Sequence, residues 1–271
     1  GREALIGSLA CGKILEEVDP EQAMGWYSRV LREDPGNMET QRALSKLYRE
    51  SGRWKELVTL LRRRASDGTK EERLEAHLEL GRCHLDLLED PLRARAEFEK
   101  AIRMDEEFSP AWLGLARAHL FNGEAQRALT ALGRTEALLG RGDEKGVSAA
   151  LVHVKQGQAL QALGKPGEAA QSIQKALVEA PQDPEVLETA TAVYEELERW
   201  DDLAEVLRRR AERRDRPVKE RLGLYGRLVK IEAFKREDMG AAKLALDEAL
   251  ILSSEDVEIL NLAARIAETT D

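Results

Sequence analysis

The chain has 271 residues, of which 34% are charged and only 4% are aromatic, and its formal net charge is -9. This negative total argues against general nucleic-acid binding, because phosphate recognition needs a basic surface. No apolar run approaches the roughly 18 residues that a membrane span needs. The low content of β-branched and aromatic residues favours a helical protein without membrane spans.

A pattern of small and large residues recurs along the whole sequence with a period of about 34 residues. The pattern is clearest in one copy, which contains Gly157, Ala169, Ala176 and Pro181 in that order. The second half of an earlier copy begins at Ala23. Small residues allow two helices to approach closely, and large ones fill the spaces between layers. The period therefore predicts a stack of helix pairs rather than one globular core.

The predicted helix pairs follow one another in chain order, and the last predicted helix has no partner. They occupy residues 4–37, 38–71, 74–108, 109–142, 150–183, 184–217 and 222–255, and the final helix occupies 256–269. The third pair needs one extra residue in its turn, near Pro91. The longer insertion at residues 139–148 predicts an exposed loop that is open to proteolysis.

Residues 52–65 are closely repeated at residues 198–211, which indicates duplication of a block of several helix pairs. Both copies carry large residues where the period expects small ones, so we expect looser packing of these two helix pairs. The residues concerned are Leu57, Arg64, Leu203 and Arg210. Each arginine closes a run of three at a helix end, which favours a solvated end that complements the helix dipole.

Over essentially its whole length the chain resembles the tetratricopeptide repeat family. The resemblance implies an all-α fold, a right-handed α-solenoid of antiparallel helix pairs with about seven repeats and a final single helix. It implies a single array over residues 1–271. It further implies a non-enzymatic scaffold or adaptor that binds a peptide or helix of another protein in a concave groove formed by the first helix of each pair.

A basic stripe and neighbouring apolar residues occupy the groove positions that the resemblance implies for repeats two to four. Arg42, Lys46 and Arg49 share one helix face because they are spaced by four and three residues. The predicted partner-binding residues are Arg42, Lys46, Arg49, Leu78, Arg82, Leu85, Leu113, Arg117, Leu120 and Phe121. We expect them to bind an acidic and partly apolar segment of another protein. The alternative interpretation is a charged face that contacts only solvent.

No motif predicts catalysis, a cofactor or a metal site. The histidines His77, His84, His119 and His153 fall at positions that normally hold a large packing residue. Two other functions stay open, a regulatory or docking arm of a larger signalling or enzymatic protein, and a sensor of peptides or small molecules. The first residue, Gly1, and the unpaired last helix predict a fragment of a longer chain. Cysteines at packing positions suit the cytoplasm, and the arginine and alanine usage suits a bacterial source.

Overall fold

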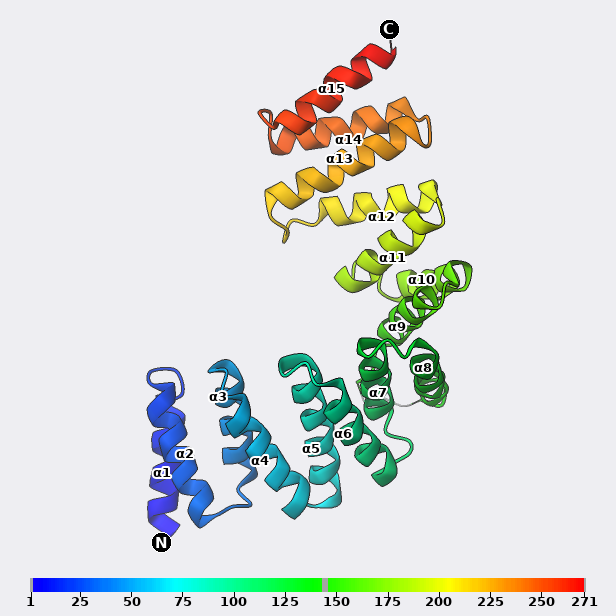
Figure 1. The fold of residues 1–271 in the computed structure, drawn as a ribbon. Coiled ribbons are helices and arrows are strands. Elements are labelled where there is room, and N and C mark those ends of the chain that lie inside the picture. The colour runs from blue at the N-terminus through cyan, green and yellow to red at the C-terminus, as the bar shows by residue number, and fades with distance from the viewer. Residues whose placement is uncertain (1, 143–145, 271) are drawn as a thin grey trace. The chain divides into compact units, whose positions relative to one another are not determined.

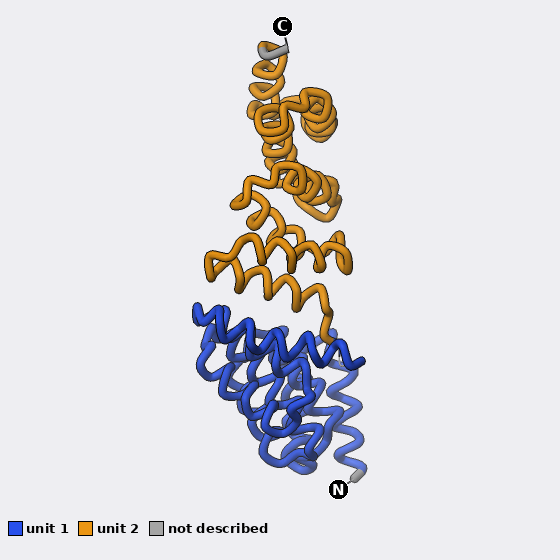
Figure 2. Tube along the Cα trace, turned by 90° about the vertical axis from the view of Figure 1, so that its right-hand side faces the viewer, with its two compact units in different colours: residues 1–146 blue, residues 147–271 orange. Residues whose placement is uncertain are grey.

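The structure is a computed structural model that describes residues 2–142 and 146–270 of the chain. These residues form fifteen α-helices and one short π-helix, with no strand among them (Figure 1). The predicted all-α fold of stacked helix pairs is therefore confirmed. The chain divides into two compact units, Gly1–Gly146 and Val147–Asp271, which are coloured separately in Figure 2. That the repeats form one continuous array stays a prediction.

Unit 1 contains antiparallel helix pairs joined by short turns. The helices are α1 (Arg2–Leu15), α2 (Pro20–Glu33), α3 (Met38–Glu50), α4 (Trp54–Asp67), α5 (Lys70–Arg82), the π-helix η1 (Cys83–Leu87), α6 (Pro91–Met104), α7 (Ser109–Phe121) and α8 (Ala125–Leu139). Each odd-numbered helix is the first of its pair, and each even-numbered helix is the second.

Unit 2 continues the same alternation of first and second helices. Its helices are α9 (Ala149–Ala162), α10 (Pro166–Glu179), α11 (Pro184–Glu196), α12 (Trp200–Glu212), α13 (Val218–Phe234), α14 (Met239–Leu252) and α15 (Val257–Thr270). Within the predicted loop at 139–148, residues 143–145 lie outside the described residues.

Helix starts are fixed by capping side chains. The carboxylates of Asp19, Asp90 and Asp183 each accept a backbone N–H from the first turn of the following helix, which begins with proline. Thr69 and Glu72 form a reciprocal capping box, so α5 begins at Lys70, earlier than the predicted repeat start at residue 74.

The extra residue predicted for the third repeat is accommodated by η1. In η1 the Leu88 N–H donates to the Cys83 carbonyl at 3.1 Å. This hydrogen bond joins residues five apart, as in a π-helix, instead of four apart as in an α-helix. The following turn places Glu89 in the left-handed region at a φ of 50°. The insertion therefore widens one helical turn and leaves the start of α6 at Pro91 undisturbed.

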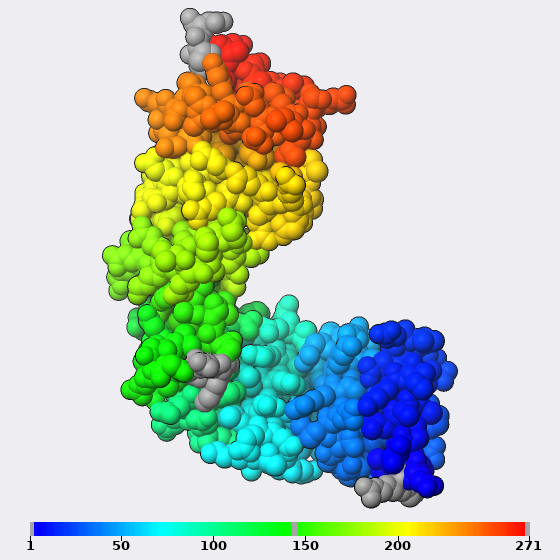
Figure 3. Space-filling model, turned by 180° about the vertical axis from the view of Figure 1, so that it is seen from behind, coloured from blue at the N-terminus to red at the C-terminus, as the bar shows by residue number. Residues whose placement is uncertain are grey.

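Small residues face large ones within and between several helix pairs, as the period predicts. A Cβ added to Gly81 would lie 2.4 Å from Phe98 Cε1, and one added to Gly114 would meet the same atom at 2.4 Å. In unit 2, a Cβ on Gly157 would lie 2.7 Å from Ile173 Cδ1. Within each unit, side chains fill the spaces between the stacked helix ribbons (Figure 3).

The helix pairs α3/α4 and α11/α12 are the loose ones. Their backbones approach each other at fewer positions than those of the other pairs, as Leu57 and Leu203 at small-residue positions predicted. Both leucines are fully buried. The prediction of a solvated helix end is wrong for Arg64, which is 5% exposed and forms an ion pair with Glu75. Arg210 instead donates to Thr191 Oγ1 at 2.9 Å.

Candidate functional site

The predicted basic residues lie on the first helices of unit 1, and we call this surface, Arg42, Lys46, Arg49, Arg82 and Arg117, the first-helix face. The side chains on α3 and at the end of α5 are exposed, and that of Arg117 on α7 is half-buried. The helical spacing of four and three residues places the α3 cations on one side of that helix. The surface therefore presents several positive charges to solvent.

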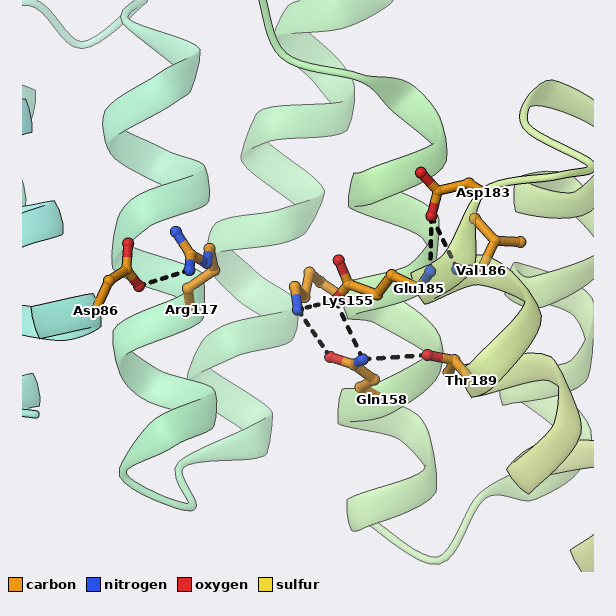
Figure 4. A network of polar contacts seen from close by, with 8 residues as sticks. All are labelled: Asp86, Arg117, Lys155, Gln158, Asp183, Glu185, Val186 and Thr189. Atoms are coloured by element: carbon orange, nitrogen blue, oxygen red, sulfur yellow. Dashed lines mark hydrogen bonds and ion pairs between the residues drawn. The ribbon is translucent and has the colours of Figure 1, made fainter. Parts of the chain in front are cut away.

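Two contacts bring parts of this face together. The Arg49 guanidinium lies near the thiol of Cys83, which follows Arg82 directly. Burial raises the pKa of the Cys83 thiol to about 11, although the Arg49 guanidinium opposes the rise. Arg117 on α7 donates to Asp86 Oδ1 at 2.7 Å, so its charge is already compensated within unit 1. Figure 4 shows this pair.

The remaining cations of the face have no acidic partner. Among the described residues, none forms a hydrogen bond or an ion pair with the side chains of Arg42, Lys46 or Arg82. These three charges are therefore available to a ligand of opposite sign.

The predicted apolar residues divide into buried and accessible ones. Leu78, Leu85 and Leu113 are 8%, 4% and 8% exposed, so they belong to the core of unit 1 and offer little surface to a partner. Leu120 is half-buried and Phe121 is 55% exposed. The first three have little accessible surface because α5 and α7 pack directly against each other. That the five apolar residues bind a partner stays a prediction.

The first helices of unit 2 carry cations that are already paired. Lys155 on α9 forms an ion pair with Glu185 on α11, and Gln158 donates to Thr189 Oγ1 at 3.2 Å (Figure 4). The Lys155 side chain is 15% exposed. This polar network joins α9 to α11 and leaves no free positive charge on Lys155.

Two cations on α13 are likewise paired with carboxylates. Arg227 on α13 lies 3.0 Å from a carboxylate oxygen of Glu195 on α11. Lys230 on α13 lies 3.1 Å from Glu258 on α15. Each pair joins successive first helices, so these two cations stabilise the stack itself.

Two histidines of unit 1, His77 and His119, occupy packing positions and contact glutamates of their own unit. His77 Nδ1 lies 2.7 Å from Glu97 Oε2. Burial opposes ionisation of Glu97, yet hydrogen bonds from His77 and Lys100 lower its pKa to about 2. His119 Nδ1 lies 2.6 Å from Glu124 Oε2. These contacts tie together the first and second helices of their pairs.

Two searches of the part of the chain that the structure describes found no further site. No cluster of at least 3 histidine, cysteine, aspartate or glutamate side chains could hold a metal ion there. No helix there is both long and apolar enough to cross a membrane.

Comparison with known proteins identifies the repeats. Residues 42–75 and 88–144 each match a model described as "Tetratricopeptide repeat". A search of curated proteins gave no match.

Solved structures share the fold. A tetratricopeptide repeat protein from Parabacteroides merdae superposes with a TM-score of 0.64 at 13% identity, over 98% of this chain and 99% of its own. YrrB, a TPR protein with an unusual peptide-binding site, gives 0.50 at 15% identity, over 70% of this chain and 91% of its own.

A chain of the APC/C hetero-tetramer Cut9–Hcn1 gives a TM-score of 0.53 at 20% identity over 92% of this chain. This protein spans only 46% of that larger chain. At these identities the likeness concerns the fold alone. Together with the matching repeat models and the observed helix pairs, it shows that residues 42–75 and 88–144 are tetratricopeptide repeats and that the described chain has the fold of tetratricopeptide repeat proteins.

Proposed function

We propose that this chain is a non-enzymatic scaffold that holds an acidic segment of a partner protein on the first-helix face of unit 1. The tetratricopeptide fold generally mediates protein–protein interaction. A stack of helices displays a long continuous surface, which suits binding better than catalysis in a deep cleft. YrrB, which shares the fold, is described by its peptide-binding site.

One observation carries the proposal. Arg42, Lys46 and Arg82 have no acidic partner among the described residues, whereas Lys155 and Arg227 on the first helices of unit 2 are paired with glutamates. Unpaired cations attract carboxylates over a distance of about 10 Å at ordinary salt and raise the association rate.

Apolar contact would add affinity to this electrostatic attraction. Leu120 and Phe121 end α7 and are the predicted apolar residues that remain accessible. An exposed aromatic side chain can anchor a partner residue, and such anchors carry most of the binding energy in protein interfaces. The segment that fits is therefore acidic with a few apolar side chains.

The test compares two charge-reversal variants in a crosslinking pull-down from a lysate of the source organism. One variant changes the face: Arg42→Glu, Lys46→Glu and Arg82→Glu. The control makes the same change of charge elsewhere, at exposed cations on α6, α13 and α14: Arg103→Glu, Lys219→Glu and Lys243→Glu.

We expect a partner that the unmodified protein and the control capture and that the face variant loses. Titration of the identified partner segment should then show a loss of affinity of at least about tenfold for the face variant, with a weaker salt dependence. Equal capture by all three proteins would contradict the proposal.

A further inference from the structure

A second surface of unit 1 combines an apolar floor with free positive charge. Between the second helices α2 and α4 lies a groove of about 400 Å³, and its floor includes Leu31, Leu44, Tyr48 and Leu60. We call it the α2–α4 groove. Its volume is at the lower end of the range of about 300–1,000 Å³ that is usual for ligand pockets.

The α3/α4 pair beside this groove is loosely packed. Leu57 occupies a position where a small residue would let α4 approach α3 closely, and it is fully buried there. The Arg64 side chain, also buried, extends to Glu75. Tyr48 and Leu60 are half-buried and line the groove.

The duplicated segment of unit 2 forms a matching groove. Between α10 and α12 lies a groove of about 400 Å³ lined by Leu177, Tyr194 and Val206. These residues stand where Leu31, Tyr48 and Leu60 stand in the first copy of the repeated block. A groove of about 430 Å³ also lies between α12 and α14, beside the closely packed α13/α14 pair, so grooves between second helices recur whatever the packing of the neighbouring pair.

The rims of the two grooves differ in charge. The α10–α12 rim carries Asp202, which pairs with Arg199 at 2.7 Å, and Glu205, which pairs with Arg209 at 2.9 Å. The Arg199 guanidinium also lies 5.0 Å from the centre of the Tyr194 ring. This rim is therefore neutralised by contacts within unit 2, and its tyrosine is covered.

The α2–α4 rim has surplus cations instead. It carries Arg32, Lys55 and Arg63 against the single carboxylate of Glu56. Among the described residues no side-chain partner exists for Arg32 or Lys55. Arg63 lies 3.8 Å from Asp67, and both side chains are at least half exposed, so this pair contributes little.

We propose that the α2–α4 groove is a second docking site, separate from the first-helix face, which takes an acidic amphipathic helix of a partner protein. Aliphatic side chains on one face of that helix enter the groove and cover Tyr48 and Leu60. Carboxylates flanking them pair with Arg32, Lys55 and Arg63. The charge of the rim selects this occupant over a basic helix of equal hydrophobicity.

The test uses defined synthetic peptides with the full chain. The probe is a fluorescently labelled amphipathic peptide of leucine and glutamate with apolar residues at helical spacing. One control peptide replaces each glutamate by lysine, and another replaces each leucine by serine. We expect the first peptide to bind at least about tenfold more tightly than either control in anisotropy titrations.

Variants then locate the bound peptide. Leu60→Ser and the combined change Arg32→Glu, Lys55→Glu and Arg63→Glu should each weaken binding by at least about tenfold. The matched control for the apolar change is Leu177→Ser, which alters the corresponding floor of the α10–α12 groove and should leave affinity within about twofold.

The face variant Arg42→Glu, Lys46→Glu, Arg82→Glu separates this inference from the proposed function. It carries the same charge change as the groove triple variant and should keep the peptide affinity within about twofold. Hydrogen exchange of the unmodified protein with peptide bound should show added protection in α2 and α4, which does not depend on any variant folding.

The inference is overturned if the leucine–glutamate peptide does not bind, or binds no better than its controls. It is equally overturned if the face variant abolishes binding while the groove variants do not. That last result would leave the proposed function in place and remove the second site.

Discussion

Helices α4 and α12 come from two copies of one repeated sequence block and can therefore be compared directly. The α3/α4 pair buries Leu57 and the α11/α12 pair buries Leu203, each at a position where the repeat expects a small residue. Each pair borders a groove of about 400 Å³. Their surfaces differ, since Arg32 and Lys55 have no side-chain partner in the described part of the chain, whereas Asp202 is paired within its unit. The buried residues are thus similar in both copies, while the exposed charges differ, and the proposals above place acidic partners on unit 1 for that reason.

The largest expected difference between the units concerns close packing. Gly81→Ala places a methyl group against Phe98, a rigid ring that also touches the Gly114 position. Gly157→Ala in unit 2 meets chiefly the flexible Ile173 side chain, with the Ala169 carbonyl oxygen at an ordinary contact distance of 3.6 Å. We expect Gly81→Ala to lower the free energy of unfolding by about 3 kcal/mol and Gly157→Ala by about 1 kcal/mol. Urea denaturation measures both values, and equal losses would contradict the packing argument.

The next effect contrasts a paired cation with an unpaired one. Lys155→Glu faces Glu185 and removes the contact with Gln158. We expect a loss of about 2 kcal/mol, whereas Lys46→Glu on the exposed face should change stability by less than about 0.5 kcal/mol. Thermal denaturation at low salt checks this. The double variant Lys155→Glu, Glu185→Lys should recover most of the loss, and failure to do so would mean that the ion pair is not what stabilises α9 against α11.

A smaller effect lies in the turn between first and second helices. Gly52 and Glu198 occupy the same place in the repeated block, with φ values of 69° and 53°. A side chain in this left-handed region costs about 1 kcal/mol. Glu198→Gly should therefore stabilise the chain by up to about 1 kcal/mol, and Gly52→Ala should destabilise it by a similar amount. If both variants change the free energy of unfolding in the same direction in chemical denaturation, backbone strain does not distinguish the two turns.

The smallest effect is a dependence on pH. His84 in unit 1 is 2% exposed, and burial lowers its pKa below the ordinary value of 6.5. The unfolded chain then binds a proton more readily than the folded one, so the His84 contribution to stability is complete above pH 6.5 and is lost as pH falls below it. We expect the melting temperature to fall less between pH 7.5 and 5.5 in His84→Phe than in the unmodified protein, on the order of one or two degrees.

Unit 2 provides an internal reference for that experiment. The backbone N–H of Asp90 donates to the His84 carbonyl at 2.7 Å, and that of Asp238 donates to the Glu232 carbonyl at 2.8 Å. The two buried residues thus occupy corresponding turns, but Glu232 is held by Arg208 and Arg236. Hydrogen exchange should show acid-dependent opening around His84 that His84→Phe reduces. An unchanged opening would assign the effect to another group.

Much of the fold could be predicted from the sequence, because helix pairing depends on local periodicity. Glycine and alanine at fixed spacing, such as Gly81 and Gly157, mark where helices must touch. The extra residue before Pro91 was visible as a break in the period. Its form as the π-helix Cys83–Leu87 was not, because an insertion can be taken up in a turn or in a helix and only the packing decides between them.

The residues of the candidate surface could be predicted less well from the sequence than the fold. Periodicity placed Leu78, Leu85 and Leu113 beside the cations, yet these leucines are buried, because a helix in a stack is covered on more than one side. The pairing of Arg117 with Asp86 joins residues from successive repeats, and no local pattern reveals whether two such side chains reach each other.

The sequence by itself therefore determined the repeat, the all-α fold and the residues that bring helices together, since these follow from spacing along one chain. Only the tertiary structure decided which charges are free and where apolar side chains stay open. Whether the charge of Lys46 or of Lys155 is available to a partner protein, or is paired with a carboxylate of the same chain, depends on distances between neighbouring helices. The α2–α4 groove likewise depends on how residues from α2, α3 and α4 come together in three dimensions.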